Sequence, residues 1–480
     1  MLGVVAHWIN KDKNLQTTLL GLRRLKGAHS GENMSAVVLE VIRTFQIESR
    51  IGYFVLDNAE TNDTCLKSLT NHIDLPVLSG QPLGRRLRCF GHIINLVVKA
   101  FLFGKDVDAF EVESRNRQDL NEEAAELQAW RKKGSIGKLH NIVMFVRRSP
   151  QRTEEFLKVQ CNAHTEASDD STGSLLLQVV EDNATRWNST YNMIYRALQV
   201  KDAIDLFTTR HLTSKRRDER TLKEDQLVEE DWDTLARILS LLEPFKKLTA
   251  RMEGRATEGS RGAIWETLPS MDFLLEHIER AKLEYEHLNK HIYSSLNNAW
   301  YKLNDYYSLT DMSPIYVAGV VLNPQYKWSY FEEKWAHKPE WIGEARRIMG
   351  EFWLTYKGKR PSVEVQQPLR KSDMDLLDEF MNATSRGPMS STEDEYERYS
   401  FSPPEPLVIS VREWWKNKRD SDLRAMAFDV QSIPAMSAEC ERVFSSGKLM
   451  ISPQRNRLGE DAIEAAELLK AWENAGMVSW

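Results

Sequence analysis

Residues 1–103 alternate between the patterns of short strands and of amphipathic helices, and this alternation restricts the region to a mixed α/β fold. Two β-branched, apolar runs at 3–9 and 15–22 flank a charged turn and predict a hairpin. Helix and strand patterns then follow one another. These predicted elements are a helix at 31–47, a strand at 51–56, a helix at 63–72, a strand at 86–90 and a helix at 92–103. The predicted order is β-β-α-β-α-β-α.

The remainder of the chain is predominantly helical in pattern. Residues 105–130 are acidic and poor in aromatic residues, which predicts a loosely packed surface excursion, and 161–174 predict a loop. Helical periodicity dominates 186–335, and a polar, proline-bearing connection follows. We therefore predict an N-terminal core part at 1–160, a helical insertion at 175–357, a connection at 358–406 and a C-terminal region at 407–480 that completes the core.

Composition indicates a globular intracellular protein. The 480 residues are 41% hydrophobic and include 14 tryptophans, enough for two or three packed cores. The four cysteines are far apart, which favours a reducing compartment over a disulfide framework. No apolar stretch reaches the roughly 20 residues that span a bilayer, so we expect a soluble chain without a membrane partner. The net charge of −6 argues against binding nucleic acid through overall charge, although local basic clusters remain available.

Two acidic residues stand where chemistry is plausible. Asp57 directly follows the apolar strand at 51–56, and side chains at the carboxyl end of a strand emerge at a sheet edge. Glu441 lies in the segment 437–452, whose polar start, Glu-Arg pair and apolar step predict a helix that presents one carboxylate. The alternative interpretations are a turn aspartate for Asp57 and a solvated helix face for Glu441.

The segment 437–452 resembles the C-terminal signature of the hAT superfamily of cut-and-paste DNA transposases. The resemblance extends upstream through Trp414-Trp415-Lys416 and Ile433-Pro434-Ala435, and downstream to a helix that ends in Lys470-Ala471-Trp472. Near the other end of the chain, Val55-Leu-Asp-Asn-Ala59 resembles the family's second carboxylate motif. The motifs occur in family order, so the resemblance covers nearly the whole chain.

This resemblance implies an RNase H-like core, a mixed sheet interrupted by a large all-α insertion and completed by C-terminal dimerisation helices. In such enzymes an Asp, a second Asp and a Glu hold two Mg²⁺ ions for phosphoryl transfer. Asp57 matches the second carboxylate and Glu441 the third, with Cys440 in place of a serine. The first Asp belongs to a strand that would precede residue 1, so the first strand is absent from this chain and the Mg²⁺ site is predicted to be incomplete. The family's DNA-reading zinc finger has no counterpart, and no zinc is predicted.

Candidate DNA contacts also follow from the resemblance. Cys89 and His92 match the family's Cys-x-x-His element, for which core packing is the alternative. Arg186 and Trp187 match an Arg-Trp motif in which the ring stacks on a flipped base, a role that needs an exposed aromatic face. Arg455 and Arg457 could neutralise phosphates, or form an ordinary solvated basic surface.

The C-terminal region is predicted to form a homodimer. Its aromatic and methionine-containing surface has the composition that interfaces favour, although the same residues could instead pack in the chain's own core. The predicted interface residues are Trp414, Trp415, Leu423, Met426, Phe428 and Val430. We expect a nuclear, hAT transposase-derived protein that dimerises and is catalytically incompetent. The alternative is a domesticated DNA- or partner-binding scaffold without metal chemistry.

Overall fold

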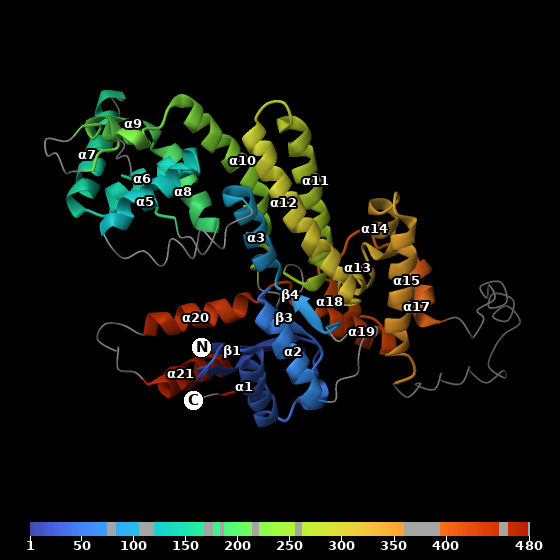
Figure 1. Ribbon diagram of the computed structural model, residues 1–480. Helices are drawn as coiled ribbons and strands as arrows, with labels where there is room; N and C mark the ends of the chain where they lie inside the picture. Colours follow the sequence, from blue (N-terminus) through green and yellow to red (C-terminus); the bar gives the residue numbers. More distant parts are fainter. Residues whose placement is uncertain are drawn as a thin grey trace, which may run out of the picture. The chain divides into compact units, whose positions relative to one another are not determined.

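The computed structural model describes residues 1–73, 83–104, 120–167, 176–182, 187–213, 220–254, 262–359, 394–450 and 459–478 (Figure 1). The chain forms two compact units. Unit 1 contains residues 1–92, 251–271 and 307–480, and unit 2 contains 93–250 and 272–306. The chain passes between the units four times, each time within a helix: α3, α10, α11 and α12.

The N-terminal hairpin forms as predicted. Strand β1 (Leu2–Ile9) pairs antiparallel with β2 (Leu15–Arg23). The turn closes through a hydrogen bond from the Asn10 amide to the Asn14 carbonyl (2.9 Å), and Lys13 takes the left-handed conformation there, with φ 63°. The charged turn residues thus fix the register of two apolar strands.

The alternating elements that follow are also present in the predicted order. Helix α1 begins with Ser30 as its cap, since the Ser30 hydroxyl accepts from the Asn33 amide. The bounds are α1 Gly31–Thr44, β3 Phe54–Leu56, α2 Glu60–His72, β4 Arg86–Arg88 and α3 Phe90–Phe103. Strand β3 is shorter than the predicted 51–56, because only its last three residues pair with β4.

The strands form two separate pairs. Within the described residues, β1 pairs with β2 and β3 pairs in parallel with β4, and each pair is a two-stranded sheet. The fold is therefore mixed α/β with a large helical part. A single RNase H-like sheet, which would need a strand between these pairs, remains a prediction.

The last two helices close over the hairpin. Helices α20 (Ala438–Met450) and α21 (Glu460–Asn474) contact β1 and β2 respectively (Figure 1). The buried carboxylate of Glu464 accepts from the Leu22 amide (3.1 Å) and from Arg23 Nη1 (2.8 Å). Trp472 Nε1 donates to the Leu19 carbonyl (3.0 Å). Side chains of α21 thus satisfy backbone groups of β2 that lie outside the hairpin pairing, and Leu19, Leu22 and Ile463 form the apolar core below.

Six helices of the described residues, α13–α15 and α17–α19, lie in the remainder of unit 1. Lys327 on α14 joins this helix to the C-terminal end of α17. Its buried ammonium donates to the carbonyls of Tyr399 (3.0 Å), Ser402 (3.0 Å) and Pro403 (3.2 Å) and lies 4.4 Å from the centre of the Tyr399 ring. The bounds of the six helices are α13 Ile315–Val321, α14 Lys327–Lys334, α15 Pro339–Leu354, α17 Glu395–Phe401, α18 Val411–Lys416 and α19 Asp422–Gln431.

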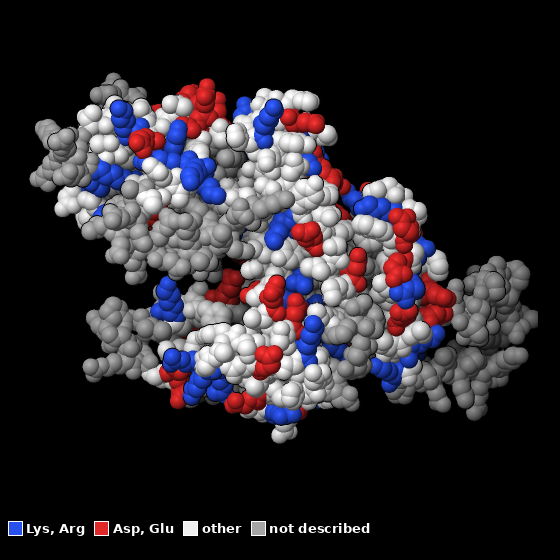
Figure 2. All heavy atoms as spheres, in the orientation of Figure 1, with Lys and Arg blue, Asp and Glu red and all other residues white. Residues whose placement is uncertain are grey.

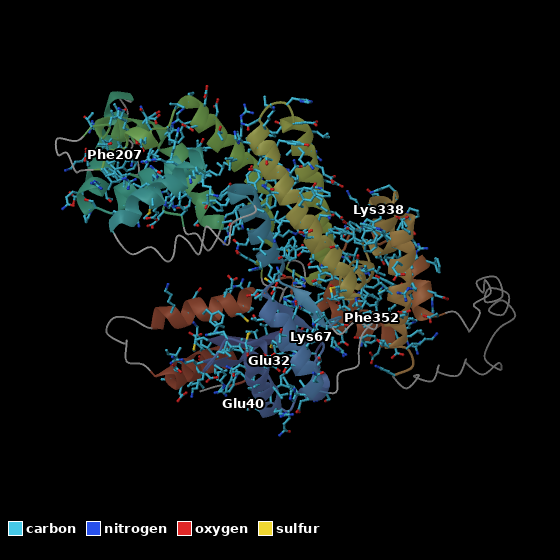
Figure 3. All side chains as sticks on the ribbon, viewed as in Figure 1. Glu32, Glu40, Lys67, Phe207, Lys338 and Phe352 are labelled. Carbon is cyan, nitrogen blue, oxygen red and sulfur yellow. The ribbon has the colours of Figure 1, made fainter. Side chains whose placement is uncertain are left out.

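All the regular elements of unit 2 within its described residues are helices. Phe207, labelled in Figure 3, is fully buried and packs edge-on against Phe145 and Phe156. The helices with residues in this unit, besides α3, are α5 Leu120–Arg131, α6 Ser135–Arg147, α7 Pro150–Ala167, α8 Trp187–Gln199, α9 Lys201–Arg210, α10 Glu229–Met252, α11 Thr267–Tyr285 and α12 Lys290–Ser308. No helix among the described residues of either unit has the length and apolar character to cross a membrane.

Two predicted irregular segments are partly helical instead. Residues 120–131 form α5, whose Trp130 is buried and stacks on His140, so this part of the predicted excursion belongs to the core. Helix α7 continues to Ala167, into the predicted loop at 161–174. The acidic composition misled the first prediction, because α5 also carries a buried residue, and the polar composition of 161–174 misled the second. The units also divide the chain differently from the predicted domains, since unit 2 begins at Ile93 and residues 307–357 belong to unit 1.

We predict that Glu464→Ala lowers the free energy of unfolding by about 2 kcal/mol, because it leaves the Leu22 amide buried without an acceptor. Urea unfolding followed by tryptophan fluorescence measures the change. Glu460→Ala is the matched control: it lies on the same helix and pairs with Arg24 at the surface, so its effect should stay below about 1 kcal/mol. Equal effects of the two substitutions would contradict a special role for Glu464.

Candidate functional site

Asp57 lies directly after β3 and is held in a defined orientation. Its Oδ1 accepts from the Ala59 amide (3.0 Å) and from Asn62 Nδ2 (2.6 Å). The side chain is exposed, and Oδ2 accepts no hydrogen bond from the described part of the chain. Asp57 therefore forms the local turn that its sequence favours and still presents one carboxylate oxygen outward.

A buried arginine fixes the backbone of this turn. Arg86 on β4 donates through Nη2 to the carbonyls of Asp57 (2.9 Å) and Ala59 (3.3 Å), and it forms an ion pair with Asp63 at the start of α2. Its side chain is only 2% exposed. Because a buried guanidinium needs partners for its donors, Arg86 couples the position of the Asp57 turn to strand β4.

Cys89 connects the two strand ends with the segment that leads into α20. The Cys89 amide donates to the Leu56 carbonyl (2.8 Å), and its sulfur accepts from the Ser437 amide (3.3 Å). Next along the chain, the Phe90 amide donates to the Ala435 carbonyl (2.9 Å). The Met436 side chain lies over Gly91, where a Cβ would come within 1.9 Å of its flexible terminal Cε. Cys89 is therefore a buried packing residue at the centre of the site.

Glu441 lies in the first turn of α20 and is exposed. It comes four residues after Ser437, a separation of roughly 6 Å along a helix. Cys89 thus contacts Leu56, the residue before Asp57, and Ser437, four residues before Glu441, and all of them belong to unit 1. Beside Glu441, burial raises the pKa of the Cys440 thiol to about 11, so this thiol stays protonated at neutral pH.

The fit to Mg²⁺ is partial. An outward carboxylate oxygen at Asp57 is a suitable hard ligand, and Glu441 would supply a second. Nevertheless, no group of three or more His, Cys, Asp or Glu side chains in the described ranges is arranged to hold a metal ion. We therefore derive no catalytic step through bound Mg²⁺ from this geometry.

The residues predicted to contact DNA differ in exposure, and some of them lie outside the described residues. Cys89 is buried, and His92 is half-buried in the first turn of α3. Trp187 is the first residue of α8 and only 3% exposed, with its amide donating to Asn95 Oδ1 (3.2 Å). The exposed face that base stacking requires is thus not available at Trp187 in this structure. Arg186, Arg455 and Arg457 lie outside the described residues.

The described residues on the face drawn in Figure 2 do not form one large basic patch. Figure 2 shows lysine and arginine side chains interspersed with acidic ones over this face. The mixture agrees with the slightly acidic net charge and favours local contacts over binding through a single charged surface.

The residues predicted for dimerisation pack mainly inside their own chain, as the alternative interpretation of this set expects, and their role in dimerisation stays a prediction. Trp415 donates through Nε1 to the Leu322 carbonyl (2.8 Å). Only Trp414 is half-exposed, and Lys418 covers its ring at 3.9 Å. The buried members of the set are Trp415, Leu423, Met426, Phe428 and Val430, each at most 5% exposed.

Sequence reasoning missed the residues that position Asp57. Asn62 lies three residues beyond the Val55–Ala59 motif and was given no role, although its amide donates to the Asp57 carboxylate. Arg86 could have been found, because a charged residue next to the apolar Leu87 on a short strand is a candidate buried partner. Arg88 offers less signal: its backbone amide donates to the hydroxyl of Tyr316, 228 residues away (2.9 Å), and burial raises that hydroxyl's pKa to about 12.

Three family models match the chain in order. Residues 1–81 match the ZBED1 RNase-like domain and 87–241 the ZBED1 RNase-like helical domain. Residues 395–473 match the hAT family C-terminal dimerisation region. The first and last matches include Asp57 and Glu441, respectively.

Similar proteins include a putative transcriptional regulator, tpeD, of Talaromyces stipitatus, 27% identical over 96% of this chain and 50% of that protein. The putative AC transposase of Zea mays is 24% identical over 98% of this chain and 54% of its own length. RICESLEEPER 2, a zinc finger BED domain-containing protein of Oryza sativa, is 20% identical over 98% and 62%. The chain thus spans about half to three fifths of the length of these relatives. With its three matched regions in sequence order, the chain belongs to the hAT family of transposase-like proteins.

Proposed function

We propose that this protein is a hAT transposase-like protein that self-associates through its C-terminal region and that residues 1–480 do not cut DNA by themselves. The match of residues 395–473 to the hAT dimerisation region carries the proposal of self-association. The incomplete carboxylate set supports the lack of cutting. Relatives named as transposases and as a putative transcriptional regulator favour action on DNA, and hence a nuclear location.

The exposed apolar residues of the C-terminal region offer a surface for self-association. Phe401, Leu407 and Ile409 are 83%, 75% and 83% exposed, far above the usual exposure of such side chains. The backbone between them is fixed, because Lys327 binds the carbonyls that follow α17 and the Glu405 amide donates to the Pro324 carbonyl (2.9 Å). A fixed apolar segment loses little conformational entropy when a second copy covers it.

We predict that light scattering shows a dimer at micromolar concentration and that the double substitution Leu407→Asp/Ile409→Asp yields a monomer. Two buried carboxylates would oppose association, while these exposed positions leave the fold intact. Leu283→Asp is the control, because Leu283 is 78% exposed but lies on α11, outside the matched region. A monomeric wild type would contradict self-association, whereas a dimeric double variant would contradict only this surface.

The geometry around Asp57 supports weak metal binding without strand cutting. One oriented carboxylate oxygen and a second carboxylate on α20 leave most of the six positions around Mg²⁺ to water. The first carboxylate of the family's set has no match within residues 1–480. Arg86 and Asn62 would then serve to orient Asp57, whatever it binds.

We predict that calorimetric titration detects Mg²⁺ binding with a Kd on the order of millimolar, and that Asp57→Asn abolishes it. Glu60→Gln, an acidic neighbour in the first turn of α2, should bind as the wild type does. No Mg²⁺-dependent nicking of plasmid DNA is expected from any of these proteins. Binding unaffected by Asp57→Asn would remove Asp57 from the site, and absence of binding in the wild type would favour a scaffold without metal chemistry. Nicking by the wild type would refute incompetence.

A further inference from the structure

Helix α8 carries a column of aromatic rings on one face. Trp187, Tyr191 and Tyr195 recur every four residues, the spacing that places side chains above one another on a helix. The Trp187 ring meets Tyr191 edge-on at 6.2 Å. The Tyr191 and Tyr195 rings are nearly parallel, at 7° with centroids 6.4 Å apart. Together the two tyrosines form an ordered aromatic platform.

Exposure increases along this column. Trp187 is 3% exposed, Tyr191 is half-buried and Tyr195 is 49% exposed. The buried tryptophan thus supports the base of the platform, while Tyr195 keeps a large part of its ring in water. Because its orientation is set by the neighbouring ring, Tyr195 would lose little side-chain entropy when another planar group stacks on it.

The charges around the platform favour an anionic partner. Helix α8 has no acidic residue and one basic residue, Arg196, in a chain of net charge −6. On α10, Lys246 donates to Asn188 Oδ1 (3.3 Å), and its ammonium lies 5.9 Å from the centre of the Tyr191 ring. The nearby carboxylate of Glu243 is paired with Lys247 at 2.8 Å. Lys246 therefore adds a positive charge beside the aromatic platform.

A second aromatic pair in the same unit, with Tyr301 exposed and Trp300 half-buried, has acidic neighbours. Trp300 and Tyr301 on α12 are close, and Lys282 lies 5.2 Å from the Trp300 ring. There, however, Trp300 Nε1 donates to the Glu279 carboxylate (2.9 Å), on a helix that also carries Glu276 and Glu284. Acidic neighbours make this pair unsuitable for a phosphate backbone, so it provides a matched control.

We propose that Tyr191, Tyr195 and Lys246 form a binding site for single-stranded DNA. A base stacks on the open face of Tyr195, and an adjacent phosphate pairs with Lys246. Duplex DNA is a poorer ligand, because its base faces are covered by neighbouring bases. The site uses neither the C-terminal region nor the carboxylates, so it is independent of the proposed self-association.

Fluorescence anisotropy with a labelled oligothymidylate tests this site in the 480-residue protein. We expect Tyr195→Ala to weaken binding about tenfold and Tyr195→Phe to retain it, because stacking needs the ring and not the hydroxyl. Lys246→Ala should weaken binding and reduce the slope of log affinity against log salt by about 0.7. Tyr301→Ala and Lys282→Ala should bind as the wild type does.

Three outcomes would overturn the proposal. They are no binding by the wild type, equal binding by Tyr195→Ala, and equal affinity for a duplex of the same length. Since Tyr195 is half-exposed, Tyr195→Ala should melt within a few degrees of the wild type, and circular dichroism checks this. A loss of binding shared by Tyr301→Ala would equally count against a site on α8.

Discussion

The structure of unit 1 depends on the closure of its last helices over its first strands. Glu464 carries a charge into a buried position, where it meets the Leu22 amide and Arg23, more than four hundred residues away in sequence. Neither end is satisfied without the other, because β2 would leave a backbone donor without a partner and α21 an uncompensated carboxylate. The chain between β2 and α21 must therefore begin and end in unit 1, and the helices of unit 2 lie within this stretch of the sequence as an insertion.

The same closure assembles the candidate site. Asp57 lies at the end of β3 and Glu441 at the start of α20, and the link between these elements passes through Cys89. The Cys89 sulfur and the Phe90 amide hold the entry to α20 beside the strand ends through hydrogen bonds with Ser437 and Ala435. The orientation of the Asp57 carboxylate is set separately, by hydrogen bonds from Asn62 to its side chain and from Arg86 to its backbone. The site therefore combines a long-range contact between the two elements that carry the acids with a local network that orients Asp57.

Local patterns predicted most of the N-terminal elements, since each signal was contained within one strand, turn or helix. The hairpin at 2–23 is an example, because its apolar runs and charged turn specify pairing without reference to the rest of the chain. Helix α5 was not predicted, because its sequence belongs to an acidic segment that is poor in aromatic residues. Its one buried tryptophan, Trp130, is held in the core by stacking on His140, a contact that the local sequence does not show. The hydrogen bonds around Asp57 were also not predicted, because Arg86 on β4 reaches the Asp57 turn only through the pairing of β3 with β4.

Periodicity indicates that a residue is buried but not what buries it, and this limit explains the revised surfaces. Trp187 and Trp415 had been assigned to contacts with DNA and with a second copy, yet both are 3% exposed in the single chain. A contact with another molecule needs area that folding has left in water. In each region such area lies nearby in sequence, at Tyr195 eight residues after Trp187 and at Leu407 eight residues before Trp415. The buried Trp187 anchors helix α8, which presents Tyr195. Leu407 lies in the irregular segment before α18, the helix that the buried Trp415 anchors, so in both regions a buried tryptophan supports the structure beside an exposed apolar or aromatic group.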